Sequence, residues 1–343
     1  MAADYITLMR ALAPDLTDEM TRRALILDRI AIMQPVGRRQ LATRLHLPER
    51  EIRNTAAMLK DLGYIELNAS GMMLSPRAEE ILESARAFSK VMNGLTEMEN
   101  RLAELLPVRR VLIAPGNVDQ EERVLSDVGR ICAARLRSQL QSGNTLAITG
   151  GRSVAAVVRG FQGSASLNVM VVPARGGLGR SVEWEANTLA EELAGKLGGH
   201  YRLIHLPDQL DAPAMQEMLK LPEVQEVTEL LQRADVILHG IGKAEDAMKT
   251  RLSRATQGRL LRQGAVGECF GAYFDLEGQC LLEASGIGVD LARLKPTCRM
   301  IAVAAGSSKA SAILSVMRHG HHELLVTDEG AAREMLALLE PRK

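Results

Sequence analysis

Aromatic residues are scarce in this chain of 343 residues. They make up 3% of the composition, and Trp184 is the single tryptophan. The core must therefore be built mainly from aliphatic side chains, and binding of single-stranded RNA on stacked aromatic platforms is disfavoured. The four cysteines form no C-x-x-C pair, so the sequence predicts neither a disulfide framework nor a thiolate zinc site.

Long apolar runs are also missing. Runs such as Met300–Ala305 fall far short of the roughly 18 residues that a membrane-spanning helix needs. Residues 1–10 carry Asp4 ahead of any cation and have no extended apolar segment, unlike a signal peptide. We therefore expect a cytoplasmic protein with no membrane contact.

Net charge is absent overall, since 42 Lys and Arg balance 42 Asp and Glu. The charges are nevertheless unevenly distributed. From Thr21 to Lys60 nine cations face three anions, an excess of six positive charges, whereas from Asp61 to Leu105 four cations face eight anions. A solvated helical face could account for the basic segment, but a concentrated basic surface is also what binds a phosphate backbone.

Two short helices joined by a tight turn are predicted inside this basic segment. They cover Arg38–Leu45 and Glu49–Leu62, and alternating residues at 64–67 and 72–74 predict a β-hairpin after them. This order of elements is typical of a winged helix-turn-helix, whose second helix enters the major groove of DNA. The expected contacts with operator DNA are Arg38, Arg39, Arg50, Arg53, Asn54, Thr55 and Lys60.

A long helix is predicted after the hairpin, with Ser75 and Pro76 at its start. Its apolar residues follow steps of three and four and include Ile81, Ala85, Phe88, Met92, Leu95, Leu102 and Leu106. Such a stripe packs either on the following domain or on a second subunit. We favour a subunit contact, because palindromic DNA sites are matched by two-fold protein symmetry, and we expect a homodimer or homotetramer.

From Val108 onward, short apolar strands alternate with helical patterns. This alternation predicts an α/β fold with a doubly wound, mostly parallel, Rossmann-like sheet covered by helices on both faces. In such folds the ligand crevice lies at the carboxyl ends of the strands.

Glycine turns with cations and hydroxyl groups follow several of these strands. Glycine-rich turns at a helix start bind phosphate through backbone N–H groups, and Arg adds bidentate contacts. Single turns of this kind are weak evidence, but their recurrence predicts a phosphorylated small-molecule ligand. The dinucleotide-binding and P-loop spacings are absent. The candidate residues are Gly150, Gly151, Arg152, Ser153, Arg175, Gly176, Gly177, Gly242, Arg251, Gly306, Ser307, Ser308 and Lys309.

Five sequence strings resemble one known family. They are the residues at 149–151, 173–179, 239–242, 306–309 and 327–332, and together with the winged helix-turn-helix they are similar to the SorC/DeoR-like sugar-binding transcriptional regulators. The two longest strings resemble the branch that regulates glycolytic genes. The resemblance implies a repressor whose operator binding is relieved by a phosphorylated sugar, with fructose 1,6-bisphosphate as inducer. It also implies an effector domain similar to sugar-phosphate isomerases and deaminases.

Carried over by motif position, the resemblance implies effector contacts at Gly150, Gly151, Arg152, Ser153, Arg175, Glu185, Arg251, Glu268 and Lys309. Two positions depart from the family pattern. Arg152 and Ser153 stand where the family commonly has a hydroxyl residue followed by Thr, and Glu185 stands where an amide is expected. The expected domains are a winged helix-turn-helix over 1–75, a linker and oligomerisation helix over 76–106, and a sugar-phosphate-binding effector domain over 107–343.

Two other functions remain as alternatives: a regulator of a different sugar-phosphate pathway, and an enzyme of the isomerase or deaminase type. An enzyme would need an acid and a histidine together in a loop, but the residues after Gly242 contain no histidine, and Glu268 is the best remaining base. We therefore expect no catalytic residues and no cofactor. The cluster of His319, His321, His322 and Glu323 is interpreted as a loop rather than a metal site.

Overall fold

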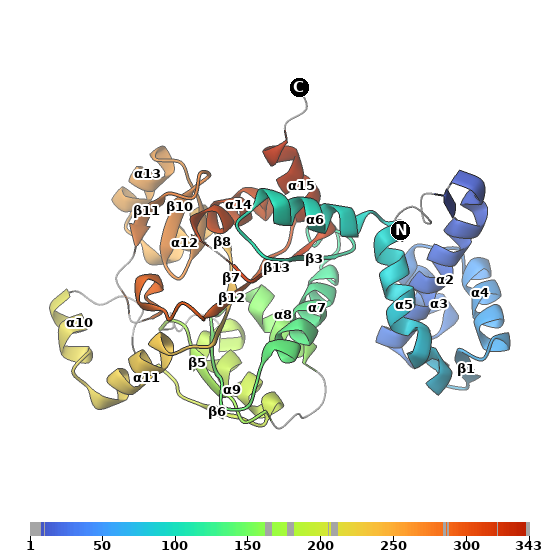
Figure 1. The fold of residues 1–343 in the computed structure, drawn as a ribbon, viewed down its shortest axis with the longest axis horizontal. Helices are drawn as coiled ribbons and strands as arrows, with labels where there is room; N and C mark the ends of the chain where they lie inside the picture. Colours follow the sequence, from blue (N-terminus) through green and yellow to red (C-terminus); the bar gives the residue numbers. More distant parts are fainter. Residues whose placement is uncertain are drawn as a thin grey trace. The chain divides into compact units, whose positions relative to one another are not determined.

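The computed structural model describes residues 8–9, 11–161, 167–176, 182–204, 206, 212–283, 286, 288–320 and 322–340. The chain divides into two compact units, Met1–Glu97 and Met98–Lys343. Figure 1 shows the ribbon of both units, with labels on most of their helices and strands. Within the described ranges, no helix is long and apolar enough to cross a membrane.

The first unit is a winged helix-turn-helix. Its helices are α2 (Pro14–Met33), α3 (Arg38–Leu45) and α4 (Glu49–Asp61), followed by an antiparallel hairpin of β1 (Ile65–Asn68) and β2 (Gly71–Leu74) and by helix α5 (Pro76–Met92). Apolar residues at helical spacing on α2, α3 and α4 meet in one core with the hairpin, where Ile30, Leu41, Ile52 and Met72 are almost inaccessible. The predicted order of elements is confirmed.

The helix predicted to run without a break from Pro76 to Leu106 is two helices, and this expectation was wrong. Helix α5 ends at Met92, and α6 spans Leu95–Leu105. Gly94 between them has φ +71°, a left-handed conformation that glycine adopts at no steric cost and that ends a helix. Both Asn93 and Gly94 donate N–H groups back to the last turn of α5.

The apolar stripe is largely used within the chain. Ile81 and Ala85 of α5 pack against the core of the first unit, and Leu102 and Leu106 are buried in a single chain. Glu99, which interrupts the stripe, accepts a hydrogen bond from the Ile113 backbone N–H at 2.6 Å. Leu102 and Leu106 are therefore not left free for the subunit contact that we favoured from the sequence.

The second unit is built on a seven-stranded sheet in which every neighbouring pair is parallel. The strand order is β3-β13-β12-β7-β4-β5-β6. The strands are β3 (Val111–Ala114), β4 (Thr145–Ile148), β5 (Met170–Pro173), β6 (His200–Tyr201), β7 (Val236–Gly240), β12 (Arg299–Val303) and β13 (Leu324–Asp328). The doubly wound fold predicted from the alternation is confirmed.

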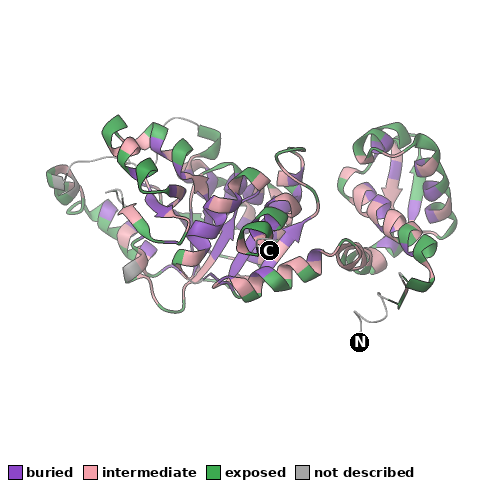
Figure 2. Cartoon of the chain, turned by 90° about the horizontal axis from the view of Figure 1, so that it is seen from above, coloured by how far each residue is buried: buried purple, intermediate pink, exposed green. Residues whose placement is uncertain are grey.

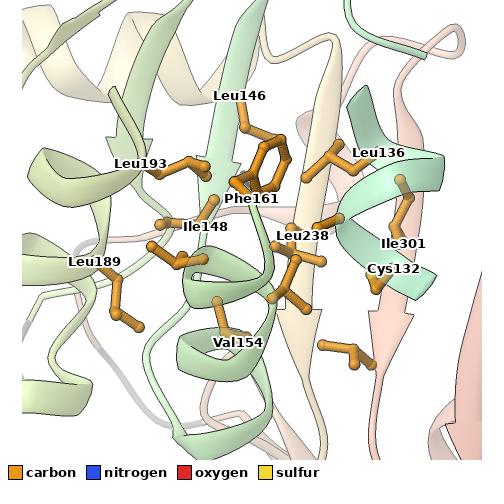
Figure 3. Close-up of a cluster of buried hydrophobic side chains, with 14 of the residues drawn as sticks. Cys132, Leu136, Leu146, Ile148, Val154, Phe161, Leu189, Leu193, Leu238 and Ile301 are labelled. Carbon is orange, nitrogen blue, oxygen red and sulfur yellow. The ribbon is translucent and has the colours of Figure 1, made fainter. Parts of the chain in front are cut away.

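Both faces of the sheet are covered, because alternate strand residues point to opposite sides. Leu146 and Ile148 point toward helices α7 (Val124–Gln139), α8 (Arg152–Gly160) and α9 (Ala186–Leu197). Figure 3 shows these two side chains and Leu238 meeting the leucines of the covering helices. Ala147 and Ile237 point to the other side, against α11 (Pro222–Gln232). The central strands of the sheet, such as β4, β7 and β13, are accordingly drawn as buried in Figure 2, whereas β6 at the edge is exposed.

A second sheet was not expected from the sequence. It has four antiparallel strands in the order β11-β10-β9-β8, made of β8 (Gly242–Lys243), β9 (Ala265–Cys269), β10 (Ala272–Asp275) and β11 (Cys280–Glu283). Helix α14 packs against β9 and β10. The other elements in the described part of this unit are α10 (Ala212–Met218), α12 (Ala244–Arg251), α13 (Arg254–Arg262), α14 (Ala310–His319), α15 (Glu329–Leu339) and the short 3-10 helices η1 (Val182–Trp184), η2 (Leu291–Arg293) and η3 (Ser307–Lys309).

Candidate functional site

Helix α4 of the first unit presents a polar face to solvent. Arg50, Arg53, Asn54 and Lys60 are exposed on it, while Arg38 and Arg39 are exposed at the start of α3. Arg39 lies 3.5 Å from Glu49, and its side chain is 90% exposed. Exposed Arg and Asn side chains on the second helix of this motif have the hydrogen-bonding groups that read guanine and adenine in the major groove.

Thr55 does not belong to this face. It is buried at 4% exposure beside Ile52, Ala56 and Leu59, which follow one another at steps of three and four along the core side of α4. The expectation that Thr55 is exposed was wrong, because its spacing from Ile52 places it on the side of the helix that packs inward.

A pocket of about 430 Å³ lies in the second unit, where the strand order reverses. On one side of β4 the chain continues to β5 and β6, and on the other side β7 continues to β12 and β13. Their diverging connections leave a crevice at the carboxyl ends of β4 and β7, which is the usual ligand position in doubly wound sheets. Thr149 and Gly150 follow β4 into the pocket, and Gly240 ends β7.

Glycines are required where the backbone turns from β4 into α8. A Cβ at Gly150 would lie 2.4 Å from the Trp184 carbonyl oxygen, and Gly151 has φ +112°. Gly151 donates its N–H to the same Trp184 oxygen at 2.8 Å. No described side chain caps the start of α8, and Gly151, Arg152 and Ser153 at this start line the pocket. A helix start of this kind stabilises an anion.

Arg175 is a buried cation in the lining of the pocket. It follows β5, is 8% exposed and donates from Nη1 to the carbonyl oxygen of Phe270. Its backbone pairs with Gly288 through an isolated antiparallel bridge. The side chain is thereby held in the crevice rather than extended into solvent, as a phosphate-binding guanidinium requires.

Glu268 and Arg251 form an ion pair in the lining of the same pocket. Glu268 Oε1 accepts hydrogen bonds from Arg251 Nη1 at 3.0 Å and from the Gly271 N–H at 2.8 Å. A Cβ at Gly242 would lie 3.1 Å from Glu268 Oε2, so glycine leaves this oxygen room. The second oxygen of Glu268 is therefore placed to accept from a ligand hydroxyl group.

Lys309 completes the set of cations. It donates to the Ile241 carbonyl oxygen at 3.3 Å. Burial lowers the pKa of Lys309, and the nearby charges of Arg152 and Lys243 lower it further. A bound anion would offset the repulsion between these positive charges. The electrostatics of the pocket therefore favour a negatively charged group such as phosphate.

The structure brings together most of the residues expected to bind the effector. Eleven of the fifteen line the pocket: Gly150, Gly151, Arg152, Ser153, Arg175, Gly176, Glu185, Gly242, Arg251, Glu268 and Lys309. Gly177 lies outside the described residues. Gly306, Ser307 and Ser308 do not line the pocket, because their turn already holds the Asp119 carboxylate, which accepts from the Ser308 N–H at 2.7 Å and from Ser307 Oγ at 3.0 Å.

Several pocket residues were missed from the sequence. Trp184, Thr250 and Phe270 line the pocket, and none of them carries a motif signal that points to a ligand. Trp184 follows a segment with no strand pattern, and Phe270 lies in the turn between β9 and β10 of the unexpected antiparallel sheet.

The described histidines near the start of β13 each have a partner within the fold. His322 Nε2 lies 3.0 Å from His239 Nε2, and His319 Nδ1 faces the Gly278 carbonyl oxygen. His321 lies outside the described residues. Among the residues described, no group of three or more His, Cys, Asp or Glu side chains could hold a metal ion.

Comparison with known proteins agrees with both units. Residues 90–337 match the family model described as "Putative sugar-binding domain", and residues 20–89 match the "CggR N-terminal DNA binding domain" model. The chain is 37% identical over 334 residues to the central glycolytic genes regulator of Priestia megaterium and 34% identical over 333 residues to that of Bacillus subtilis. Each alignment covers 96% of this chain and 98% of the relative.

Solved structures share the fold. A protein from Enterococcus faecalis described as a SorC family transcriptional regulator is 33% identical, with a TM-score of 0.65, and the match covers 70% of this chain and 99% of that one. The full-length sorbitol operon regulator SorC from Klebsiella pneumoniae matches 94% of this chain and 100% of its own, with a TM-score of 0.64 at 20% identity. The second likeness shows the fold alone.

These relatives are named as transcriptional regulators, which agrees with the interpretation as a regulator rather than an enzyme. The resemblance inferred from the sequence strings is confirmed. This chain belongs to the SorC-type family of sugar-binding transcriptional regulators, in the branch of the central glycolytic genes regulators.

Proposed function

We propose that this protein represses glycolytic genes by binding operator DNA, and that a phosphorylated sugar relieves the binding. Fructose 1,6-bisphosphate is the first candidate effector. The observation that carries the proposal is the pocket at the sheet's switch point, into which Arg152, Arg175, Arg251 and Lys309 converge. Its volume of about 430 Å³ lies in the range of small-molecule sites.

The charges in the pocket favour a ligand with two phosphate groups. Four cations face two carboxylates, Glu185 and Glu268, and one of these, Glu268, is held by Arg251. In the proposed complex, the start of α8 and Lys309 bind one phosphate, Arg175 and Arg152 serve the other, and Glu268 accepts from a sugar hydroxyl group. Arg supplies the planar, bidentate contacts that phosphate prefers.

The proposed division of labour follows the domain order. Residues 1–75 bind the operator through Arg38, Arg39, Arg50, Arg53, Asn54 and Lys60, residues 76–106 connect, and residues 107–343 bind the effector. We propose that the protein works as a homodimer or homotetramer, since two winged helix-turn-helix units then bind the two half-sites of the operator. The coupling is a linkage: an effector that weakens operator binding by some factor must itself bind less tightly to the operator complex by the same factor.

An operator titration tests this function. Duplex DNA selected by the protein from a random library serves as the operator, and its binding is followed by gel shift and fluorescence anisotropy. Fructose 1,6-bisphosphate, glucose 6-phosphate, dihydroxyacetone phosphate and unphosphorylated fructose are then added. Release by a sugar phosphate but not by fructose supports the proposal, and no release by any sugar phosphate overturns it.

A pair of variants assigns the response to the pocket. Arg175→Ala is expected to keep operator affinity in the absence of effector and to lose the release by sugar phosphate. Arg202→Ala serves as the control, because Arg202 is a half-exposed arginine of the same unit that pairs with Glu226 and does not line the pocket. A normal response of Arg175→Ala would place the effector site elsewhere.

A further inference from the structure

The loop between β3 and α7 brings two carboxylates to positions where the sequence led us to expect phosphate. Asp119 occupies the turn at Ser307 and Ser308, as described above. Glu122 Oε1 pairs with Arg152 Nη2 at 2.5 Å. Arg152 lines the pocket, whereas Glu122 does not. The loop therefore contacts a cation of the pocket through a residue that lies outside the pocket lining.

The pair between Arg152 and Glu122 lies at the mouth of the pocket. The Arg152 side chain is 52% exposed and the Glu122 side chain 81% exposed. The guanidinium carbon of Arg152 lies 5.9 Å from the centroid of the Trp184 ring, so Arg152 also makes a cation–π contact with this ring. Ion pairs as exposed as this one contribute little free energy and exchange readily.

The charge balance at the mouth explains why the partner of Arg152 matters. Arg152 and Lys243 both lie close enough to Lys309 to lower its pKa. Glu122 offsets part of this positive charge with a single negative charge. A phosphate monoester carries about −1.5 to −2 at neutral pH and is therefore a stronger partner for Arg152 than a carboxylate.

We propose that Glu122 is a specificity-determining residue of the effector site, because it competes with the ligand for Arg152. This inference rests on the proposed function. A second phosphate on the sugar displaces Glu122 with a gain in charge. A carboxylate at the same end of the sugar only replaces one carboxylate by another and gains nothing. A monophosphate held deeper in the pocket leaves the pair intact.

Calorimetric titration of the full chain with three ligands tests the inference. The ligands are fructose 1,6-bisphosphate, 6-phosphogluconate, which carries a phosphate and a carboxylate, and fructose 6-phosphate. In the unaltered protein, 6-phosphogluconate is expected to bind no more tightly than fructose 6-phosphate. Glu122→Gln is expected to tighten the binding of both ligands with two anionic groups by about threefold to fivefold, a size typical of an exposed ion pair. Its effect on fructose 6-phosphate should be within about 1.5-fold.

Two matched variants separate direct competition from a general change in charge. Glu121→Gln removes the same charge from the neighbouring residue, which pairs with Arg123 and not with Arg152. It should leave all three affinities unchanged. In an Arg152→Gln background, Glu122→Gln should no longer change ligand affinity, because the guanidinium group for which Glu122 and the ligand compete is absent.

The outcomes for the inference and for the proposed function differ. If the unaltered protein binds none of the three ligands, the proposed function fails. If it binds the bisphosphate but Glu122→Gln behaves like Glu121→Gln, or if the gain persists without Arg152, only the inference about Glu122 is overturned. Glu122 is largely exposed, so its replacement leaves the fold intact.

Discussion

The guanidinium group of Arg175 occupies the space that a side chain at position 271 would need. A Cβ on Gly271 would lie 1.3 Å from Arg175 Nη1 and 2.2 Å from its guanidinium carbon. Gly271 belongs to the turn between β9 and β10, so the unexpected antiparallel sheet sets the position of a cation that follows β5 in the large sheet. Arg175 is thus positioned by its own strand and by the absence of a side chain about 100 residues later.

Gly271→Ala is therefore expected to weaken sugar-phosphate binding at least about tenfold, because Arg175 must move. The matched control is Gly264→Ala. Gly264 has φ +85°, close to the φ of +81° at Gly271, but nothing lies within 4 Å of its Cβ position. Both variants should lose about 1–2 kcal/mol of stability from the left-handed backbone, measured by urea denaturation. Only Gly271→Ala should lose affinity in calorimetry, and equal affinities would contradict the positioning role.

Arg53→Ala is expected to weaken operator binding by about 1–3 kcal/mol, the size of one base or phosphate contact, and to leave sugar-phosphate affinity unchanged. Thr55→Val on the same helix is the control, because Thr55 is buried and faces the core. Its operator affinity should stay within about twofold of the unaltered protein. Fluorescence anisotropy with the selected operator measures the affinity of both variants. If Thr55→Val lost as much operator affinity as Arg53→Ala, the weakening could not be assigned to a contact between Arg53 and DNA.

Trp184 should report effector binding through its fluorescence. It is the single tryptophan, it lines the pocket and it is 38% exposed. Indole emission depends on its access to water, so a sugar phosphate seated beside Arg152 should change the intensity or wavelength in a saturable way. Unphosphorylated fructose should give no change, and neither should Arg175→Ala titrated with the sugar phosphate at the same concentrations. A signal that fails to saturate would count against a bound ligand at this site.

Acid should destabilise the second unit through His239. Burial lowers the pKa of His239 to about 3, and His322 adds to this effect, whereas the usual value is 6.5. Because the folded state holds the neutral form, the unfolded state binds the extra proton between about pH 6.5 and 3. Stability is fully present above pH 6.5 and falls as the pH drops, by up to about 1.4 kcal/mol per pH unit.

Urea denaturation at several pH values between 7 and 5 measures this slope. His239→Gln should flatten it, even though the variant is less stable overall. His200→Gln provides the control for the substitution itself, since His200 is exposed in β6 and lies outside the buried pair of His239 and His322. If His239→Gln and the unaltered protein lost stability with falling pH at the same rate, the acid destabilisation could not be assigned to His239.

Local patterns predicted the elements whose signals lie within a few residues. Helix α3 begins and ends at the predicted residues, Arg38 and Leu45. The convergence of the strand ends was also predictable, because parallel strands bring their carboxyl ends to one edge of the sheet. Thr55 could have been placed correctly from its spacing to Ile52 and Leu59.

Other features depended on contacts that no local pattern contains. The turn of the β9–β10 hairpin has Phe270 at φ +52°, a conformation that large side chains rarely adopt, so no turn signature marks it. The turn at Ser307 and Ser308 has the composition of a phosphate site, but Asp119 reaches it across 189 residues. The partner of Arg152 lies 30 residues away in the chain.

The break at Asn93 and Gly94 bears on how such regulators change over evolution. Each unit holds its own buried core, and the break lies just before the boundary between the units. Recombination of genes at this point would exchange the sensor while cutting through neither core. A DNA-binding unit can in this way be joined to effector-binding units for new metabolites without losing its ability to fold.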